Sequence, residues 1–274
     1  MSSSFHDGIP KISDYKAVLE SKEFKEIENF SDAFIQLNKA ILQKFPKWWA
    51  ADALHSWSRQ WEYPYVYDKI TREIQDHTNV RILDAGSGIT FFPYFLRNKW
   101  KNADIFCCDY NDTLSKLFKR INEKHAANVN FSAADLMKLP YNDEFFDIVY
   151  CISVLEHTTN YEIIIDEFRR VMKPGGLLVL TFDISLDGTL DISIDKATIL
   201  VRLLTQRFQS KKMDIQSLIS KPEIWTTVIA KKLNPRLLPW RIPLLTYIKN
   251  SVNNRRLVSW IPPITVFCLS LKRL

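Results

Sequence analysis

Three aspartates in this sequence could bind a small polar ligand. Asp84, Asp109 and Asp135 each end or follow a short, strand-like apolar run. Carboxylates at such positions can accept hydrogen bonds from hydroxyl and amino groups. Gly86 and Gly88 follow Asp84 closely, and glycines there let the backbone turn sharply and approach a bound molecule. Taken alone, this short glycine pattern also fits a plain turn between a strand and a helix.

Asp109 has the spacing of a ribose-binding acid. It lies about two dozen residues past the glycines, where an acid ending a second strand can accept hydrogen bonds from both ribose hydroxyls of a nucleoside. The simpler alternative is a helix cap, because Asn111 or Asp112 opens the next expected helix. Both interpretations can hold, since Asp109 and the cap are different residues.

A histidine is the side chain best suited to take a proton from a hydroxyl nucleophile near neutral pH. His157 closely follows the apolar run Phe146–Ile152, at the strand end where open α/β sheets bind ligands. The alternative is that His157 is a structural residue in a Glu-His turn. His55 and Asp183 are the other catalytic candidates.

Strands and helices alternate along the chain and must position these residues. Apolar runs predict strands around Ile82–Leu83, Asp104–Asp109, Val129–Ala133, Phe146–Ile152, Leu177–Phe182 and Thr265–Leu271, with a short strand at Lys212–Ile215. Helical spacing predicts two helices between Ser13 and Phe45, and others over Tyr67–Asp76, Tyr161–Met172, Ile192–Phe208, Ile219–Leu233 and Arg241–Val252. Residues 1–12 are polar and expected to be poorly ordered. This alternation predicts an α/β fold with parallel strands and right-handed crossovers.

Composition limits the compartment and the partners. The four cysteines lie in apolar runs, which favours buried thiols in a reducing cytoplasm over a disulfide framework or a metal site. There is no signal-peptide pattern and no apolar run of membrane-spanning length. The net charge of +6 is uneven, because residues 200–274 hold 14 Lys and Arg against two acids. Such a basic segment suggests an anionic partner, such as an acceptor or the inner face of a membrane, or is simply a solvated basic surface.

A set of motifs between Val80 and Asp183 resembles the class I S-adenosylmethionine-dependent methyltransferases, in particular their small-molecule and glycan branch. The resemblance is carried by Leu83-Asp84-Ala85-Gly86-Ser87-Gly88, Asp135-Leu136, Leu139-Pro140, Phe146-Asp-Ile-Val, Leu155-Glu156-His157 and Lys173-Pro-Gly-Gly176. The family's usual third glycine is Thr90 here. The set is specific, although no single motif would be.

The resemblance implies a fold, a cofactor and roles for residues. It implies a Rossmann-like, mostly parallel seven-stranded sheet with helices on both faces and an antiparallel last strand, and the cofactor S-adenosylmethionine, which becomes S-adenosylhomocysteine. Asp84, Gly86 and Gly88 would face its methionine end, Asp109 the ribose, and Asp135 and Leu136 the adenine. Ser87 and Tyr110 would also contact the cofactor, and Cys151 would lie near its carboxylate or sulfonium.

Other classes of protein fit less well. A nicotinamide dehydrogenase would need a third glycine where this chain has Phe91. Some relatives bind a metal through Glu-x-x-Glu-His, but Ser153 stands at the first position, which argues against a metal site. A non-catalytic nucleoside-binding module would be expected to lose the three aspartates.

The sequence says least about the identity of the methyl acceptor. We expect a methyltransferase acting on a hydroxyl of a sugar, glycan or other small anionic acceptor, as in surface-polysaccharide or secondary metabolism. The alternatives are an RNA or amine N-methyltransferase or a non-catalytic module. An aromatic block, which either packs on the sheet or forms a lid, supplies the candidate substrate-binding residues Trp57, Arg59, Trp61 and Tyr65.

These expectations divide the chain into four parts. Residues 1–79 are an N-terminal helical extension or lid, and residues 80–186 are the cofactor-binding core. Residues 187–263 are a basic helical cap over the substrate, and residues 264–274 are the final strand returning to the core.

Overall fold

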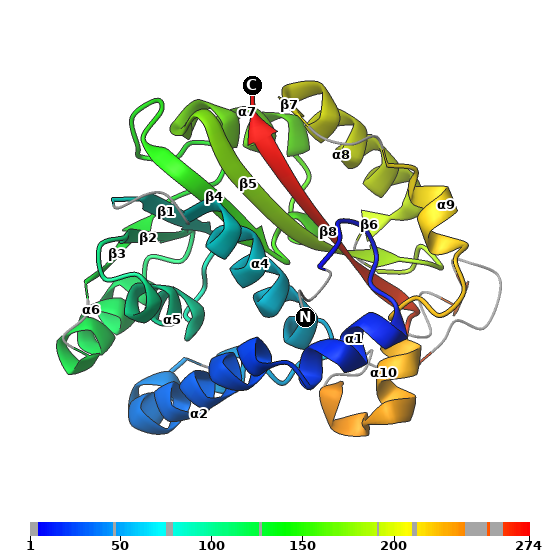
Figure 1. Ribbon diagram of the computed structural model, residues 1–274, viewed down its shortest axis with the longest axis horizontal. Coiled ribbons are helices and arrows are strands. Elements are labelled where there is room, and N and C mark those ends of the chain that lie inside the picture. Colours follow the sequence, from blue (N-terminus) through cyan, green and yellow to red (C-terminus); the bar gives the residue numbers. More distant parts are fainter. Residues whose placement is uncertain are drawn as a thin grey trace.

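The computed structural model describes residues 5–45, 48–74, 79–125, 128–190, 192–209, 213–238, 251–252 and 260–274. One eight-stranded sheet runs through the centre of the molecule (Figure 1). Its strands are β1 (Arg81–Ala85), β2 (Asp104–Asp109), β3 (Val129–Ala133), β4 (Phe146–Ile152), β5 (Met172–Ser185), β6 (Ile192–Ser193), β7 (Phe208–Gln209) and β8 (Ile264–Arg273).

The strand order fixes where a ligand can bind. It is β3-β2-β1-β4-β5-β8-β7, with β6 beside β5. Strands β1 to β5 pair in parallel, whereas β8 runs antiparallel between β5 and β7. The order reverses between β1 and β4, and ligands of open α/β sheets bind outside the carboxyl ends of the strands at such a point. The predicted fold class and the antiparallel last strand are confirmed, with eight strands instead of seven.

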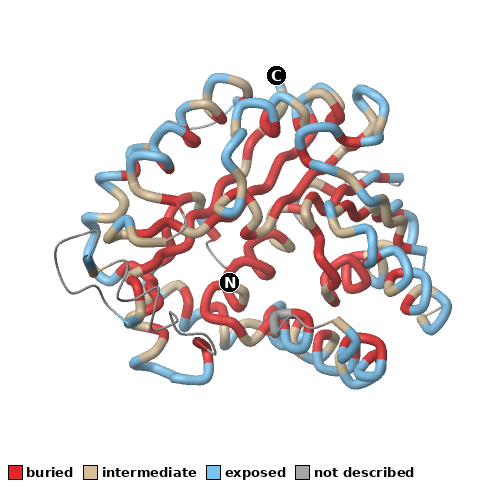
Figure 2. The backbone as a smooth tube through the Cα atoms, turned by 180° about the vertical axis from the view of Figure 1, so that it is seen from behind, coloured by how far each residue is buried: buried red, intermediate tan, exposed pale blue. Residues whose placement is uncertain are grey.

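Successive side chains of each strand point alternately into two separate apolar cores. Ile82, Ile148 and Tyr150 face one side of the sheet, while Leu83 and Val149 face the other. This period of two follows from the pleat, and both faces are apolar because helices cover both. Figure 2 shows the resulting buried strands beneath more exposed helices.

The helices are divided between the two faces. One face packs against α1 (Ile12–Leu19), α2 (Lys22–Leu42), α4 (Arg59–Ile74), α5 (Phe92–Lys99), α6 (Leu114–His125) and α10 (Thr227–Leu233). The other packs against α7 (Tyr161–Val171), α8 (Ile194–Arg207) and α9 (Ile215–Ile219). The short helix α3 (Trp48–Ala51) precedes α4, and single 3-10 turns lie at Leu155–His157 (η1) and Pro235–Leu237 (η2).

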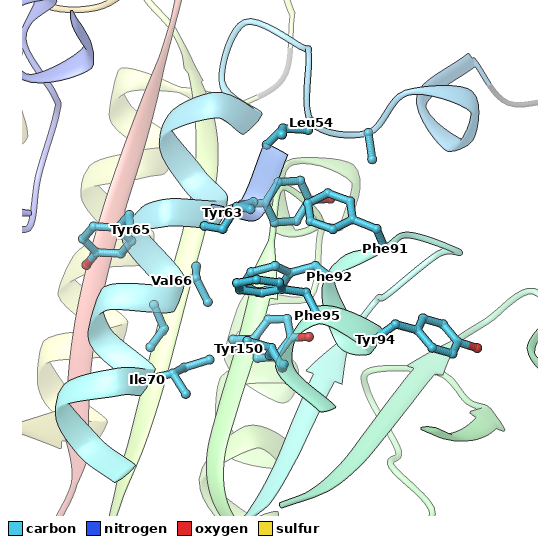
Figure 3. Packing of buried hydrophobic residues seen from close by; sticks show 14 of the residues in the cluster. Leu54, Tyr63, Tyr65, Val66, Ile70, Phe91, Phe92, Tyr94, Phe95 and Tyr150 are labelled. Atoms are coloured by element: carbon cyan, nitrogen blue, oxygen red, sulfur yellow. The ribbon is translucent and has the colours of Figure 1, made fainter. Parts of the chain in front are cut away.

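Helix α4 joins the N-terminal helices to the sheet. Figure 3 shows Tyr63, Val66 and Ile70 of this helix near Phe92 of α5 and Tyr150 of β4. The helix begins at Arg59, eight residues before the expected Tyr67, and continues through an internal proline, Pro64. A proline inside a helix removes a backbone hydrogen bond. Here the buried aromatic face of the helix outweighs that cost.

Several expectations about local structure were wrong. Within residues 1–12, the described part is ordered by pairing, since Gly8 bridges to Cys268 and Phe5 is buried. The helix predicted over Ile219–Leu233 forms only from Thr227, because Ile224 and Thr226 bridge to Lys11 and Thr265. A strand at Lys212–Ile215 is replaced by β7 at Phe208–Gln209 and by α9 from Ile215. Nearly all of the helix predicted over Arg241–Val252 lies outside the described residues.

The N-terminal helices pack directly on the sheet. Residues from α1, α2 and α4 share one apolar core with the sheet. None of the described helices combines the length and apolar character needed to cross a membrane.

Candidate active site

A cavity of about 920 Å³ opens at the carboxyl ends of the central strands. Its walls come from the loops after β1, β2, β3, β4 and β5 and from the segment before and within α4. Among the predicted site residues, the cavity brings together Trp57, Arg59, Asp84, Gly86, Ser87, Gly88, Asp109, Tyr110, Asp135, Leu136, His157 and Asp183. It does not include Cys151, His55, Trp61 or Tyr65.

The glycine loop after β1 turns under constraint from two sides. The backbone N–H groups of Gly86 and Ser87 both donate to the carbonyl oxygen of Cys108 on β2, each at 2.9 Å. Gly86 has φ +79° and Gly88 has φ +53°, a region that side-chain-bearing residues rarely adopt. A Cβ on Gly86 would lie 2.7 Å from both methyl groups of Val154. The glycine is therefore required by its backbone angle and by the close approach of the loop after β4.

Asp109 stabilises this loop from the end of β2. Its carboxylate accepts the backbone N–H of Gly88 at 3.0 Å and that of Asn111 at 3.0 Å. A carboxylate has about four acceptor positions, so Asp109 can also receive ligand hydroxyls. The neighbouring Tyr110 is 86% exposed and lines the same wall.

Asp84 is an acid held in a poorly solvated position. It is 5% exposed, and burial raises its pKa to about 8, an effect that the negative charge of Asp109 adds to and that Tyr150 and Arg59 oppose. The neighbouring protein groups do not bring the pKa of Asp84 back to its ordinary value. A cationic group of a ligand placed beside Asp84 would do so.

The loop after β3 supplies one acid and two apolar side chains. Asp135 is exposed and accepts the backbone N–H of Met137 at 2.8 Å, while Leu136 is buried. Both lie in the cavity wall with Met137. A flat apolar group with an amino substituent would fit between such partners.

Cys151 lies within β4, fully buried and outside the cavity wall. Burial raises the pKa of its thiol well above the ordinary value, so the thiol stays protonated. The residues of this strand end that reach the cavity are Ile152 and Ser153. The side chains of a strand alternate between the two faces, which accounts for the difference between Cys151 and its neighbour.

Three titratable residues line the part of the cavity wall that is formed after β4 and by β5. Glu156 and His157 belong to η1, and Asp183 lies near the end of β5. His157 is exposed and the other two are partly buried. This wall can exchange a proton with a bound molecule, since imidazole and carboxylate groups are the usual general bases.

His55, by contrast, is held away from the cavity between two carboxylates. Its Nδ1 lies 2.9 Å from Asp52 and its Nε2 lies 3.2 Å from Glu28 of α2. The hydrogen bond that His55 donates to Asp52 is the main cause that raises the pKa of His55 to about 9, with burial opposing it. A histidine that stays protonated at neutral pH stabilises the helices around it and does not act as a base.

Of the three aromatic residues predicted to bind substrate, one lies at the cavity and two lie in the core. Trp57 lines the cavity and is 2% exposed. Trp61 packs against Phe5 with a ring separation of 5.0 Å, and the Tyr65 hydroxyl donates to Asp7 at 2.6 Å. Trp61 and Tyr65 therefore attach the N-terminal segment to α4.

Arg59 reaches the cavity as one half of an ion pair that the sequence analysis missed. Its Nη1 donates to Oε2 of Glu62 at 2.7 Å, and Glu62 has no exposed surface. The Ser153 hydroxyl donates to Oε1 of Glu62 at 2.7 Å, and the Thr181 hydroxyl donates to the same oxygen. The spacing of three residues between Arg59 and Glu62 suits a pair on one helix face, and it was the available signal in the sequence.

In the described part of the chain, no group of three or more His, Cys, Asp or Glu side chains is placed to hold a metal ion.

Comparison with protein families finds one match, to a methyltransferase domain over residues 83–180. This range begins in β1 and ends in β5. It contains the glycine loop, Asp109, Asp135 and η1, but not α4 or β8.

Individual relatives give the same result. A methyltransferase named GfsG from Streptomyces halstedii is 41% identical over 143 residues, which are 49% of each chain. The ubiquinone/menaquinone biosynthesis C-methyltransferase UbiE of Stutzerimonas stutzeri is 37% identical over 106 residues, 37% of this chain and 41% of its own. The chain spans about half the length of the curated relatives that it matches.

Among solved structures, the fold is similar to geranyl diphosphate C-methyltransferase from Streptomyces coelicolor A3(2), crystallised with Mg²⁺, geranyl-S-thiolodiphosphate and S-adenosyl-L-homocysteine. The TM-score is 0.53 at 10% identity, over 93% of this chain and 99% of the other. At this identity the likeness concerns the fold alone.

Proposed function

We propose that this chain, whose residues 83–180 form a class I S-adenosylmethionine-dependent methyltransferase domain, methylates a hydroxyl of a small sugar or glycan acceptor. The observation that supports the proposal is that two groups of elements line one cavity. The loops after β1, β2 and β3 (the first wall) carry the glycine loop with Asp84, Asp109 and Asp135, and the start of α4, η1 and the end of β5 (the second wall) carry Arg59, Glu156, His157 and Asp183. The first wall suits a nucleoside, and the second offers groups that can bind an acceptor and take its proton.

S-adenosylmethionine fits the residues of the first wall. Asp109 has acceptor capacity left for ribose hydroxyls, and the buried Asp84 lacks the positive charge that an ammonium group would bring. Asp135 and Leu136 would hold the adenine. When bound, the cofactor supplies a methyl group on a sulfonium, which is already activated for transfer.

With such a reagent, the protein's work is to place the acceptor in line and to manage one proton. His157 is the proposed base, because it lines the cavity and an imidazole has the appropriate pKa range. Trp57 and Arg59 are the proposed acceptor contacts. Arg59 is the one Lys or Arg in the cavity wall among the residues that the structure describes, so a phosphate or carboxylate on the acceptor would lie beside it.

The acids of the cavity favour an amine as the second candidate acceptor. Besides the three aspartates assigned to the cofactor, Glu156 and Asp183 line the cavity, and Arg59 is already paired with Glu62. An excess of carboxylates attracts a cationic acceptor and repels a second phosphate.

The test is transfer of a labelled methyl group to sugars that differ in charge. Glucose, glucosamine, glucuronic acid and glucose 1-phosphate would be compared, followed by nucleotide sugars, glycans, a quinone and RNA. Labelled methyl on a hydroxyl oxygen supports the proposal, and labelled methyl on nitrogen favours the amine alternative. S-adenosylhomocysteine that binds while no member of any class is methylated would contradict both.

A further inference from the structure

The proposal concerns Glu62, a carboxylate in α4 that the cavity wall itself does not include. Glu62 receives three hydrogen bonds, from Arg59 on its own helix, from Ser153 after β4 and from Thr181 on β5. Its exposed fraction is 0%. We propose that Glu62 is the positioning residue that holds Arg59 at the acceptor end of the cavity and fixes α4 to the ends of β4 and β5. This inference rests on the proposed function for its kinetic consequences, but not for its structural ones.

The division of contacts between the two oxygens of Glu62 is specific. Oε2 accepts from Arg59, whereas Oε1 accepts from both hydroxyls. A planar guanidinium held at one edge has the rest of its donors left for other partners. Glu62 therefore determines the orientation of Arg59, which lines the cavity.

The hydroxyl partners of Glu62 lie where the cavity meets the sheet. Ser153 lines the cavity and has φ +48°, a strained backbone angle for a residue with a side chain. Its backbone N–H donates to the carbonyl oxygen of Thr181 at 2.9 Å. Glu62 thus supports the strained residue just before η1, the turn that carries Glu156 and His157.

Burial of this ion pair is costly and has to be justified by something other than stability. A buried pair often contributes no more to stability than an apolar substitute of the same size. The side chain of Arg59 is 23% exposed and lines the cavity. Burial lowers the pKa of Arg59, but the charges of Glu62, Glu156 and Asp183 raise it by more. The ion pair instead places a fixed cation among these acids.

Glu62→Gln separates the two functions of the carboxylate. The amide oxygen can still accept from Ser153 and Thr181, but the amide N–H₂ faces the N–H groups of Arg59 and cannot accept from them. The matched control is Tyr15→Phe, which removes another buried hydrogen bond to α4, from the Tyr15 hydroxyl to Gln60 at 2.6 Å. Tyr15 does not line the cavity.

The first measurement needs no acceptor. The guanidinium N–H signals of Arg59 would be recorded by nitrogen-15 NMR on the full chain and identified by their loss in Arg59→Lys. We expect slowly exchanging signals in the parent and in Tyr15→Phe, and their loss in Glu62→Gln. Signals that persist in Glu62→Gln would overturn the structural part of the proposal, even if no acceptor is ever methylated.

The second measurement uses the best acceptor of the charge series. We expect Glu62→Gln to lower kcat/KM for the acceptor at least tenfold while the Kd for S-adenosylhomocysteine changes less than threefold, and Tyr15→Phe to change neither beyond threefold. In an Arg59→Ala background, Glu62→Gln should have less than a threefold further effect, because its effect passes through Arg59. Full additivity of the two substitutions, or equal losses from Glu62→Gln and Tyr15→Phe, would show a merely structural role.

Discussion

At the scale of single residues, the carboxylate of Asp109 both stabilises the glycine loop and is placed to bind a ligand. It accepts the backbone N–H groups of Gly88 and Asn111, and so sets the shape of the loop that a cofactor would contact. Removal of Asp109 therefore affects the ligand directly and through the loop.

We expect Asp109→Ala to raise the Kd for S-adenosylhomocysteine more than about tenfold, a loss of about 1.4 kcal/mol or more. Hydrogen bonds to a charged partner contribute about 1.5–3 kcal/mol each. Calorimetric titration is the measurement, with circular dichroism to verify folding. Asp112→Ala is the control, since Asp112 is exposed and outside the cavity wall. Equal Kd values for the two variants would contradict the role of Asp109.

Asp84 makes ligand binding depend on pH. Its pKa of about 8 means that the carboxyl group is mainly protonated at pH 7. A ligand ammonium beside it stabilises the anion and expels the proton, so affinity should rise as the pH is raised from 6 to 8. Calorimetry at pH 7 in buffers of different ionisation enthalpy should detect release of up to about one proton per S-adenosylhomocysteine bound. Asp84→Asn should abolish that release; an unchanged release in the variant would exclude Asp84 as its source.

The same shift affects stability in the absence of ligand. The pKa of Asp84 is raised above its ordinary value of 3.8, so the folded state binds a proton that the unfolded state has lost between about pH 4 and pH 8. The contribution of this group to stability is complete below pH 4 and is lost as the pH rises through about 8. This loss should be absent in Asp84→Asn.

At the scale of elements, the turn between β1 and α5 is packed against the loop after β4. Gly86 has φ +79° and no room for a Cβ beside Val154, whereas Gly175 has φ +76° and nothing within 4 Å of an added Cβ. Alanine substitutions at the two glycines therefore measure separately the free-energy cost of the backbone angle and that of the close contact.

We expect Gly175→Ala to lose about 1–2 kcal/mol of unfolding free energy from the backbone angle alone. Gly86→Ala should lose about 1–3 kcal/mol more, because the added methyl group overfills the contact with Val154. Val154→Ala should recover part of that extra loss in the Gly86→Ala background and none in the Gly175→Ala background. Urea titrations of the parent, the three single variants and the two double variants measure these terms, and additive effects of Gly86→Ala and Val154→Ala would disprove the contact.

Elements with a strong local pattern were predictable from the sequence. The runs that form β2, β3 and β4 were predicted with the bounds found here, because each is a short run with apolar residues at alternate or successive positions between polar segments. The start of α4 was not predicted. Pro64 and the aromatic residues around it form a helix only because they pack against the sheet. Isolated β-bridges between distant residues, such as that between Lys11 and Ile224, also leave no pattern in the local sequence.

The candidate site was predictable in the parts that follow a motif. The glycine loop, Asp109, Asp135 and His157 all line the cavity. Cys151 does not, because its side chain and that of Ile152 point to opposite faces of one strand. Glu62 was missed, because its partners Ser153 and Thr181 are about a hundred residues away in sequence, and no spacing rule identifies such a contact.

At the scale of the whole molecule, the segment before α1 crosses the sheet and joins α4 to β8. Asp7 accepts hydrogen bonds from the hydroxyls of Tyr65 and Ser270 and lies 3.0 Å from the Lys69 ammonium. Burial raises the pKa of the Tyr65 hydroxyl well above its ordinary value, so this group remains a donor that needs its partner.

We expect Asp7→Ala to lower the unfolding free energy by about 1–3 kcal/mol, because it leaves the buried Tyr65 hydroxyl unsatisfied. His6→Ala is the control, since the His6 contact with Asp14 is largely exposed and contributes about 0–1 kcal/mol. Neither variant should alter the Kd for S-adenosylhomocysteine, because neither residue lines the cavity. Denaturant titration and calorimetry measure the two quantities, and a weakened Kd in Asp7→Ala alone would show that the segment supports the site.

The position of β8 has a consequence for the order in which the chain can fold during synthesis. β8 pairs with β5 along nine residues, from Leu177 to Ser185 (Figure 1), yet the ribosome makes it long after β5. Until Ile264–Arg273 has emerged, the edge of β5 presents unpaired backbone groups, and such edges recruit other chains. The segment around Gly8 is made before β5 and waits still longer, because its partner Cys268 lies in that late strand. The nascent protein therefore passes through a stage in which β5 is open to aggregation until β8 pairs with it.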